Sequence, residues 1–353
     1  SRRFARLRDY AGRGVATTAT YPARDLGVHS GIGLMKAALR APDCILLPTD
    51  FERYREYSRR FKAAVAEVAP LIEDRGIDEI YIDLTELPGA QHDAGARAAQ
   101  RLKDAVRNAT GGLTCSIAVA PNKLLAKIGS ELDKPNGLTL LGPGDLEARV
   151  WPLAAKKVNG IGPKASVKLA GFGLHTIGDI AAAEPAWLIE HFGKSYGAWL
   201  HEASHGRDER AVVTFSEPKS ISRETTFERD LHAVRDRAAL SAIFTELCVQ
   251  LAGDLARKGY ASRTIGIKLR YDDFRIVTRD LSLTAHTLDA PTIRRAAGEC
   301  LKRVDLSRRL RLLGVRAGAL ASLAELIAPQ PGAAAPQTVR EPEPTYTLPL
   351  FDA

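Results

Sequence analysis

The sequence predicts a multidomain α+β protein, and three observations lead to this class. Strand-like and helix-like stretches alternate over residues 1–150, and residues 151–205 read as short helices with short loops. After a charged, proline-containing linker at 207–222, strands and helices return. A chain of 353 residues is long enough for about two to four separate cores. These features favour several packed α+β domains.

The first 150 residues have the periodicities of a sheet covered by helices. Apolar residues recur on one face of 52–69, which predicts a helix that ends at Pro70. A second helix is expected over 92–108, before a Gly-Gly turn. Between them, apolar residues alternate over 80–84 and predict a strand with one buried face.

Two adjacent carboxylates, Asp78 and Glu79, precede that strand and could bind a divalent metal. On an ideal strand their side chains would point to opposite faces. Both can reach one metal only if the backbone bends, which Gly76 permits. Alone, such a pair is more often a solvated surface feature. Neighbouring motifs decide between the two interpretations.

Groups suited to a polyanion accompany the carboxylates. Residues 114–127 predict a short apolar strand, a turn and a lysine-bearing helix, and Lys134 follows where that helix stops. Upstream, Tyr21 and Arg24 lie near a predicted strand-to-helix junction. Arg24 and Lys134 suit a triphosphate, because Arg can bind two oxygens at once and Lys acts as a point charge.

In this order, the segments resemble a Y-family DNA polymerase of the DNA polymerase IV (DinB) type, from about Arg13 to Leu320. The resemblance implies a translesion, error-prone polymerase that adds dNTPs to the primer of a primer–template DNA. It implies transfer with two Mg²⁺ ions held by Asp78 and Glu79, the latter beside the primer terminus. Tyr21, Arg24 and Lys134 would hold the triphosphate, with Ser116 and Lys127 in supporting roles. 

The resemblance also implies a domain division. In chain order, we expect a palm and fingers (1–150), a helix-hairpin-helix thumb (151–206), a linker (207–222), an α+β little finger that binds DNA (223–327) and a disordered tail (328–353).

The thumb segment 157–164 fits the hairpin of a helix-hairpin-helix element. Gly160 and Gly162 allow close backbone approach, and a helix starting at Pro163 would direct its free N–H groups, beside Lys164, at a DNA phosphate. An ordinary turn between helices is the alternative interpretation.

Positive charge is concentrated in one part of the chain. Residues 219–320 contain 20 Lys and Arg against 12 Asp and Glu, which accounts for the entire formal charge of +8. The strand predicted at 263–271 carries Arg263, Lys268 and Arg270, which we expect to contact the DNA backbone. A solvated surface with a high isoelectric point is the alternative.

The chain ends with an apolar group, Leu348, Leu350 and Phe351, in a Pro/Ala-rich segment. This end is similar to the sliding-clamp-binding peptide of bacterial polymerases, with Thr347 where the family usually has Gln. We therefore expect a clamp partner, bound with altered affinity. A frayed terminus with stray apolar residues is the alternative.

One part of the family pattern is missing from this sequence. The family opens with an apolar strand that carries the first metal-binding Asp and is followed by the residue that excludes ribonucleotides. This chain starts at Ser1, downstream of that strand, and Asp9 follows a basic run instead. We expect a fragment whose palm sheet has unpaired backbone and whose catalysis is weak or absent.

Composition excludes some classes. Four scattered cysteines without CxxC spacing indicate neither zinc sites nor disulfides, and no run reaches the length of a membrane span. We expect a cytoplasmic monomer without a membrane partner. Two other hypotheses remain: a non-catalytic DNA- and clamp-binding paralogue, and a helix-hairpin-helix nuclease or repair factor.

Overall fold

The computed structural model describes residues 5–89, 93 and 95–327, and confirms the predicted multidomain α+β class. The chain forms two compact units. The first is built mainly from residues 42–216, and the second from residues 8–16, 20–41 and 217 onward. The boundary at 216 falls inside the segment predicted as a linker, and a strand already begins at Ser220.

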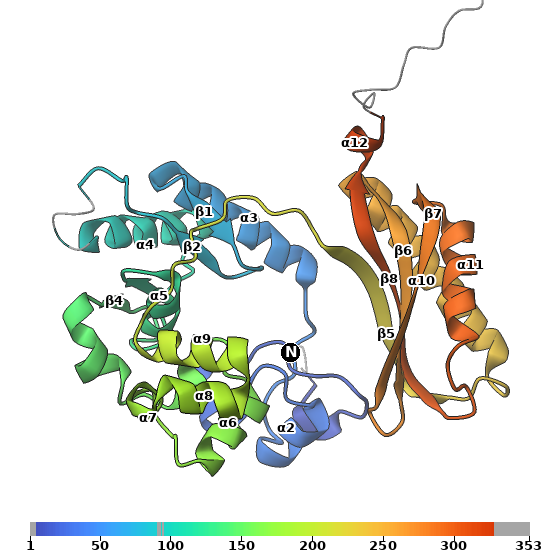
Figure 1. Ribbon diagram of the computed structural model, residues 1–353, viewed down its shortest axis with the longest axis horizontal. Helices are drawn as coiled ribbons and strands as arrows, with labels where there is room; N and C mark the ends of the chain where they lie inside the picture. Colours follow the sequence, from blue (N-terminus) through green and yellow to red (C-terminus); the bar gives the residue numbers. More distant parts are fainter. Residues whose placement is uncertain (1–4, 90–92, 94, 328–353) are drawn as a thin grey trace, which may run out of the picture. The chain divides into compact units, whose positions relative to one another are not determined.

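The first unit contains two separate small sheets (Figure 1). In one, β1 (Ile72–Asp74) pairs antiparallel with β2 (Ile80–Ile82). In the other, β3 (Ile117–Val119) pairs parallel with β4 (Leu138–Leu140). Each strand is only three residues long, so these sheets depend on the helices around them.

Two long helices support the sheets, and both were predicted. Helix α3 (Phe51–Val68) begins where the Asp50 carboxylate accepts a hydrogen bond from a backbone N–H, and it ends before Pro70. Helix α4 (Ala96–Thr110) starts later than the predicted range of 92–108. Val65 of α3 and Leu102 of α4 are fully buried between them, and apolar side chains of β2 pack against this core.

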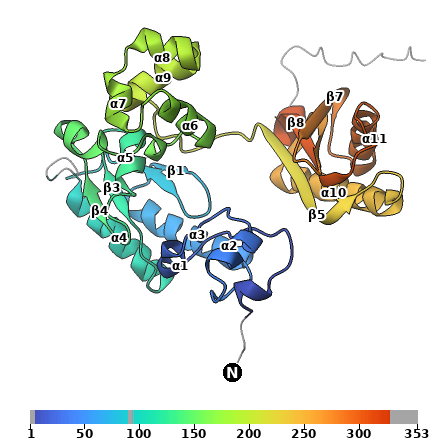
Figure 2. The same cartoon turned by 90° about the horizontal axis from the view of Figure 1, so that it is seen from below.

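A second core of the first unit joins α5 (Lys123–Gly129) to a group of short helices (Figure 2). Thr176 caps one of them through a reciprocal capping box with Asp179. The short helices of this group are α6 (Pro163–Gly171), α7 (Ile177–Ala182), α8 (Pro185–Phe192) and α9 (Lys194–Ser204). Shorter turns of helix precede them: η2 (Pro143–Asp145), η3 (Leu146–Val150) and η4 (Ala155–Lys157).

The second unit contains one antiparallel sheet of four long strands in the order β5-β8-β6-β7. Both α10 and α11 pack on it and on each other, so they cover the same face. The strands are β5 (Ser220–Leu231), β6 (Tyr260–Tyr271), β7 (Ile276–Thr287) and β8 (Leu310–Ser322). The helices are α1 (Tyr21–Asp25), α2 (Leu34–Arg40), α10 (Arg237–Lys258), α11 (Ala290–Leu301) and α12 (Leu323–Ile327), and a 3₁₀ turn, η1, spans Leu7–Asp9.

One sequence expectation needs correction. No apolar run was expected to reach the length of a membrane span. Among the described residues, however, α10 is long and apolar enough to cross a membrane, judged by length and composition alone. Its apolar side chains, such as Leu251 and Leu255, are buried in the core under the sheet. The length and apolarity of α10 therefore follow from covering strands of 12 or 13 residues.

Candidate functional site

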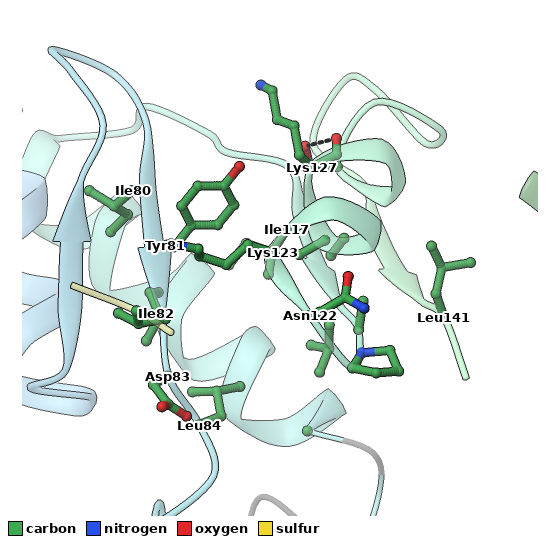
Figure 3. Close-up of a pocket in the computed structure, with 18 of the residues that line it drawn as sticks. Ile80, Tyr81, Ile82, Asp83, Leu84, Ile117, Asn122, Lys123, Lys127 and Leu141 are labelled. Carbon is green, nitrogen blue, oxygen red and sulfur yellow. Dashed lines mark hydrogen bonds between the residues drawn. The ribbon is translucent and has the colours of Figure 1, made fainter. Parts of the chain in front are cut away.

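A cavity of about 920 Å³ lies in the first unit between the two small sheets (Figure 3). Residues 78–85 line one side of it and residues 115–122 the other. Apolar side chains of α3 and α4, including Val65 and Leu102, contribute to its lining. The cavity therefore combines strand ends, an apolar core and the acidic pair predicted from the sequence.

The edge of β2 that faces away from β1 has free peptide groups. The flanking hydrogen bonds run from Arg75 N–H to the Glu79 carbonyl and from Asp83 N–H to the Leu71 carbonyl. Because bonded and non-bonded positions alternate in an antiparallel pair, the peptide groups of Ile80 and Ile82 point away from β1. Within the described part of the chain, no strand pairs with them.

The edge of β3 is open in the same way. Its bonds to the β4 side run from Ile117 N–H to the Gly137 carbonyl and from Leu141 N–H to the Val119 carbonyl. The peptide groups of Ala118 therefore point away from β4 and have no strand partner among the described residues. The predicted unpaired backbone is thus present on both sides of the cavity.

Asp78 and Glu79 both line the cavity, as part of the turn that leads into β2. Gly76, just before them, has φ of 141°, a conformation that L residues rarely adopt, so the predicted bend is real. Asp78 is exposed, whereas Glu79 is partly buried and its Oε2 lies 3.0 Å from Lys127 Nζ. In the described residues no group of three or more metal-ligating side chains occurs.

The predicted supporting residues lie beside this pair. Lys127, on α5, and Ser116, at the start of β3, both line the cavity. The Ser116 hydroxyl accepts a hydrogen bond of 3.1 Å from Gly137 N–H and so fixes the turn before β4. Lys134 lies in that turn, and its Nζ is 2.6 Å from Glu131 Oε1.

The sequence analysis missed a buried ion pair at the cavity. Lys123 Nζ lies 2.6 Å from Glu73 Oε2, with each side chain about 10% exposed. Figure 3 shows the lysine side chain extending from α5 toward Tyr81, whose ring centroid is 5.5 Å from Nζ. Burial opposes ionisation of Glu73, but hydrogen bonds from Lys123 and from Val213 N–H outweigh it, so the pKa of Glu73 lies below its ordinary value.

The same pair anchors the chain that leaves the helical group. Lys123 Nζ also donates to the Ala211 carbonyl at 2.7 Å, and Glu73 accepts from Val213 N–H at 2.9 Å. Asp208 accepts from Leu124 N–H at 3.0 Å. The first half of the predicted linker is therefore held against β1 and α5. Nothing in the sequence of these segments predicts this attachment, because its partners are 50 to 140 residues apart.

Tyr21 and Arg24 lie on α1 in the second unit. The Arg24 guanidinium carbon is 5.1 Å from the centroid of the exposed Tyr21 ring, a cation–π contact. The strand expected before this helix is reduced to an isolated bridge between Val15 and Gly33.

The predicted hairpin has the expected local geometry. Gly162 is the N-cap of α6, and Pro163 is its first residue. Gly160 has φ of 119°, and a Cβ there would lie 2.6 Å from the Trp199 ring, so only glycine fits. Lys164 is exposed in the first turn of α6.

The basic strand β6 has one buried face and one outer face. Ile265, Ile267 and Leu269 are buried under α10 and α11, so Lys268 and Arg270 lie on the outer face. Lys268 Nζ is 2.8 Å from Glu224 on β5.

Strict alternation along β6 would place Arg263 on the same face as the buried Ile265 and Ile267, yet Arg263 is exposed. A register irregularity between Ser262 and Thr264 explains this, since a bulge redirects side chains. The predicted clamp-binding residues Leu348, Leu350 and Phe351 lie outside the described residues.

Comparison with known proteins completes the description of the site. The sequence model of the impB/mucB/samB family matches residues 6–131. The model of the impB/mucB/samB family C-terminal domain matches residues 218–328. The chain is 36% identical over 334 residues to DNA polymerase IV of Streptomyces coelicolor, covering 94% of this chain and 69% of that one. It is 40% identical over 307 residues to DNA polymerase IV of Caulobacter vibrioides, covering 86% and 74%.

Solved structures give the same result. A Y-family DNA polymerase chimera, Dbh-Dpo4(243-245)-Dbh, aligns with a TM-score of 0.76 at 25% identity and covers 90% of this chain and 91% of its own. The structure of DinB from Sulfolobus solfataricus aligns with a TM-score of 0.59 at 25% identity and covers 87% and 88%.

Proposed function

The chain belongs to the impB/mucB/samB family, as a Y-family DNA polymerase of the DNA polymerase IV (DinB) type, and from this premise we propose how its residues perform the reaction. A member of this family is a translesion DNA polymerase that acts on a DNA template-primer with dNTPs. The observation that carries the proposal is the position of Asp78 and Glu79, side by side on one wall of the cavity.

Asp78 and Glu79 would hold the Mg²⁺ ions that the family implies. The donor set fits, because Mg²⁺ in phosphate-transfer sites uses one or two carboxylates and takes further oxygens from the substrate and water. When bound, two such ions activate the primer 3′-oxygen and neutralise the triphosphate. The residues present supply two adjacent carboxylates, one of them exposed.

Lys127 has a separate task at this site. Its ammonium neutralises Glu79 at 3.0 Å, so in the free protein the carboxylate is oriented and its charge is balanced. Lys127 thus holds the Glu79 carboxylate in position at the cavity wall.

Tyr21, Arg24 and Lys134 would bind the triphosphate of the incoming dNTP. Arg24 offers two donors to one phosphate, and Lys134 offers a compact charge, both suited to the charge that develops on the leaving pyrophosphate. The exposed Tyr21 ring, in contact with the Arg24 guanidinium, would keep that group oriented.

Two surfaces would hold the DNA backbone without reading sequence. One is the hairpin with Gly160, Gly162 and Lys164, where a helix begins with free N–H groups. The other is the outer face of β6, with Lys268 and Arg270, together with Arg263 at the bulge. These assignments follow the division of the chain into palm and fingers, thumb, linker, little finger and tail stated above.

The remaining partners are also proposals. The end of the chain, with Leu348, Leu350 and Phe351, would bind a sliding clamp. We place the protein in the cytoplasm as a monomer, where Cys248 and Cys300 remain buried thiols.

Primer extension tests the proposed function. The full chain is given primed DNA, dNTPs and Mg²⁺, beside Glu79→Ala and the matched control Glu67→Ala, which removes an exposed carboxylate of α3. We expect only weak extension by the unaltered chain, because both of its small sheets have open edges in the part of the chain that the structure describes. Glu67→Ala should extend equally, and Glu79→Ala should lose about a hundredfold or more of that activity. No extension by any of the three, with salt-sensitive DNA binding retained, would favour the non-catalytic DNA- and clamp-binding paralogue instead.

A further inference from the structure

Four charged side chains of alternating sign form a continuous row that starts at the cavity wall. Glu79 Oε2 lies 3.0 Å from Lys127 Nζ, and Lys127 Nζ lies 3.9 Å from Glu131 Oε1. The same Glu131 oxygen lies 2.6 Å from Lys134 Nζ. The row thus joins a proposed metal ligand to a proposed triphosphate ligand through one carboxylate, Glu131, to which no role has been assigned.

The backbone of this row is well supported. Glu131 follows the end of α5, and its N–H donates to the Ile128 carbonyl at 3.1 Å. After it, the Asp133 carboxylate accepts a hydrogen bond from the Thr139 hydroxyl of β4. The turn that carries Lys134 is therefore anchored on both sides, and the Lys134 side chain is the part that can move.

The stronger contact of Glu131 is with Lys134. Glu131 Oε1 lies 2.6 Å from Lys134 Nζ, which is within hydrogen-bonding distance. It lies 3.9 Å from Lys127 Nζ, which is too long for a hydrogen bond. Burial opposes ionisation of Glu131, but the hydrogen bond and charge of Lys134 outweigh it and hold the pKa of Glu131 below its ordinary value. At neutral pH the charged carboxylate of Glu131 is therefore paired with the Lys134 ammonium.

We propose that Glu131 is a positioning residue that acts as an internal counter-anion for Lys134, and that an incoming triphosphate must displace it. The proposal rests on the proposed function, because it takes Lys134 as a triphosphate ligand. While the Glu131 carboxylate is paired with Lys134, the lysine ammonium is held near the cavity but is not free to bind other anions. A ligand with several negative charges can outcompete one carboxylate, whereas a singly charged anion cannot.

The proposal has a direction that a purely structural role lacks. Glu131→Gln removes the competing charge and keeps the side-chain length, so Lys134 becomes available and triphosphate binding tightens. Both side chains are more than a third exposed, so the pair is weak and the expected gain is about two- to fivefold. A residue that merely supported the fold would weaken binding when it was replaced.

Equilibrium binding of dATP to the full chain tests this. The variants are Glu131→Gln and the control Glu67→Gln, which makes the same charge change at an exposed residue of α3. Among the described residues Glu67 forms no ion pair. We expect a two- to fivefold lower Kd for Glu131→Gln and an unchanged Kd for the control. An unchanged or higher Kd in Glu131→Gln would overturn the proposal, as would an equal gain in the control.

A double-mutant cycle identifies the residue through which Glu131 acts. In a Lys134→Ala background, Glu131→Gln should no longer tighten dATP binding, because the lysine that it would release is absent. Tightening that persisted in that background would mean a general charge effect and would overturn the role assigned to Lys134.

The two proposals can fail separately. A chain that extends primers but whose dATP affinity ignores Glu131→Gln retains its function and loses this inference. A chain that does not extend primers but shows the tightening loses the proposed reaction and keeps the role of Glu131.

Discussion

The sheet of the second unit and the small sheets of the first unit are built in contrasting ways. β5 to β8 are 12 or 13 residues long and form one continuous sheet, whereas each strand of the first unit has three residues. Among the described residues, the core under the long sheet contains 20 buried residues, including Leu251 and Ile265, whereas the core under β1 and β2 contains four.

The difference separates the two tasks assigned to the molecule. The long sheet is stabilised by its own apolar packing, so the charged side chains on its outer face, which we propose to contact DNA, are not part of its core. In the first unit, strand edges and carboxylates line a cavity, and a buried ion pair joins β1 to α5. Removing charge should therefore affect stability in the first unit and binding in the second.

The largest expected contrast is in amide hydrogen exchange. The amides of Ile265 and Ile267, in the centre of the long sheet, should exchange only on global unfolding, since β6 is paired on both sides. The amides of Ile80 and Ile82 have no strand partner among the described residues and should exchange at least about a thousandfold faster. Exchange measured by NMR or mass spectrometry gives both sets in one experiment.

Tyr81 provides the internal control. Its peptide groups face β1, so its amide should exchange more slowly than those of its two neighbours. Strong and uniform protection across residues 76–84 would contradict the expected contrast and would mean that another segment pairs with the open edge of β2.

The next effect in size is the loss of the buried ion pair. Lys123→Met leaves Glu73 charged, about 10% exposed and without its main partner. Breaking such a pair costs about 3–5 kcal/mol, so the free energy of unfolding of the first unit should fall by that amount. Urea denaturation followed by tryptophan fluorescence measures the change, because Trp151, Trp187 and Trp199, the three tryptophans of the chain, all lie in this unit.

A double variant and a change of pH both sharpen this result. Adding Glu73→Gln to Lys123→Met removes the stranded charge and keeps an acceptor for Val213 N–H, so much of the stability should return. Because the pKa of Glu73 is below 4.5, its stabilisation is complete above that pH and is lost as the pH falls through the folded-state value. Lys123→Met should lack this acid-dependent loss.

The same contrast explains which parts of the fold were predictable. The long periodic segments, such as α3 and β6, were predicted within about three residues because their apolar spacing alone defines them. The division of the first unit into two small sheets was not predicted in this form, since pairing of three-residue strands depends on contacts far apart in the sequence.

The candidate site was predictable where its residues are neighbours or, as for Ser116 and Lys127, belong to a motif of the family. Asp78 and Glu79 are adjacent in the sequence, and Gly76 indicates the backbone bend beside them. Lys123 and Glu73 are 50 residues apart, and nothing in either segment indicates the other. The missed pair shows that local motifs locate the chemistry, whereas the contacts that hold it in place arise from packing.

The smallest expected effect is on the outer face of the long sheet. Lys268→Ala removes a cation whose pair with Glu224 is solvent-exposed, so the free energy of unfolding should change by less than about 1 kcal/mol. If Lys268 contacts a phosphate, the slope of log K against log salt for DNA binding should become shallower by about 0.9. Glu224→Gln is the matched variant, because it releases the same lysine and should strengthen binding slightly.

A slope that is unchanged in Lys268→Ala would mean that the outer face of β6 does not bind the DNA backbone through this residue. Deleting one lysine should therefore cost stability at position 123 and DNA affinity at position 268, which is the functional meaning of the two kinds of sheet.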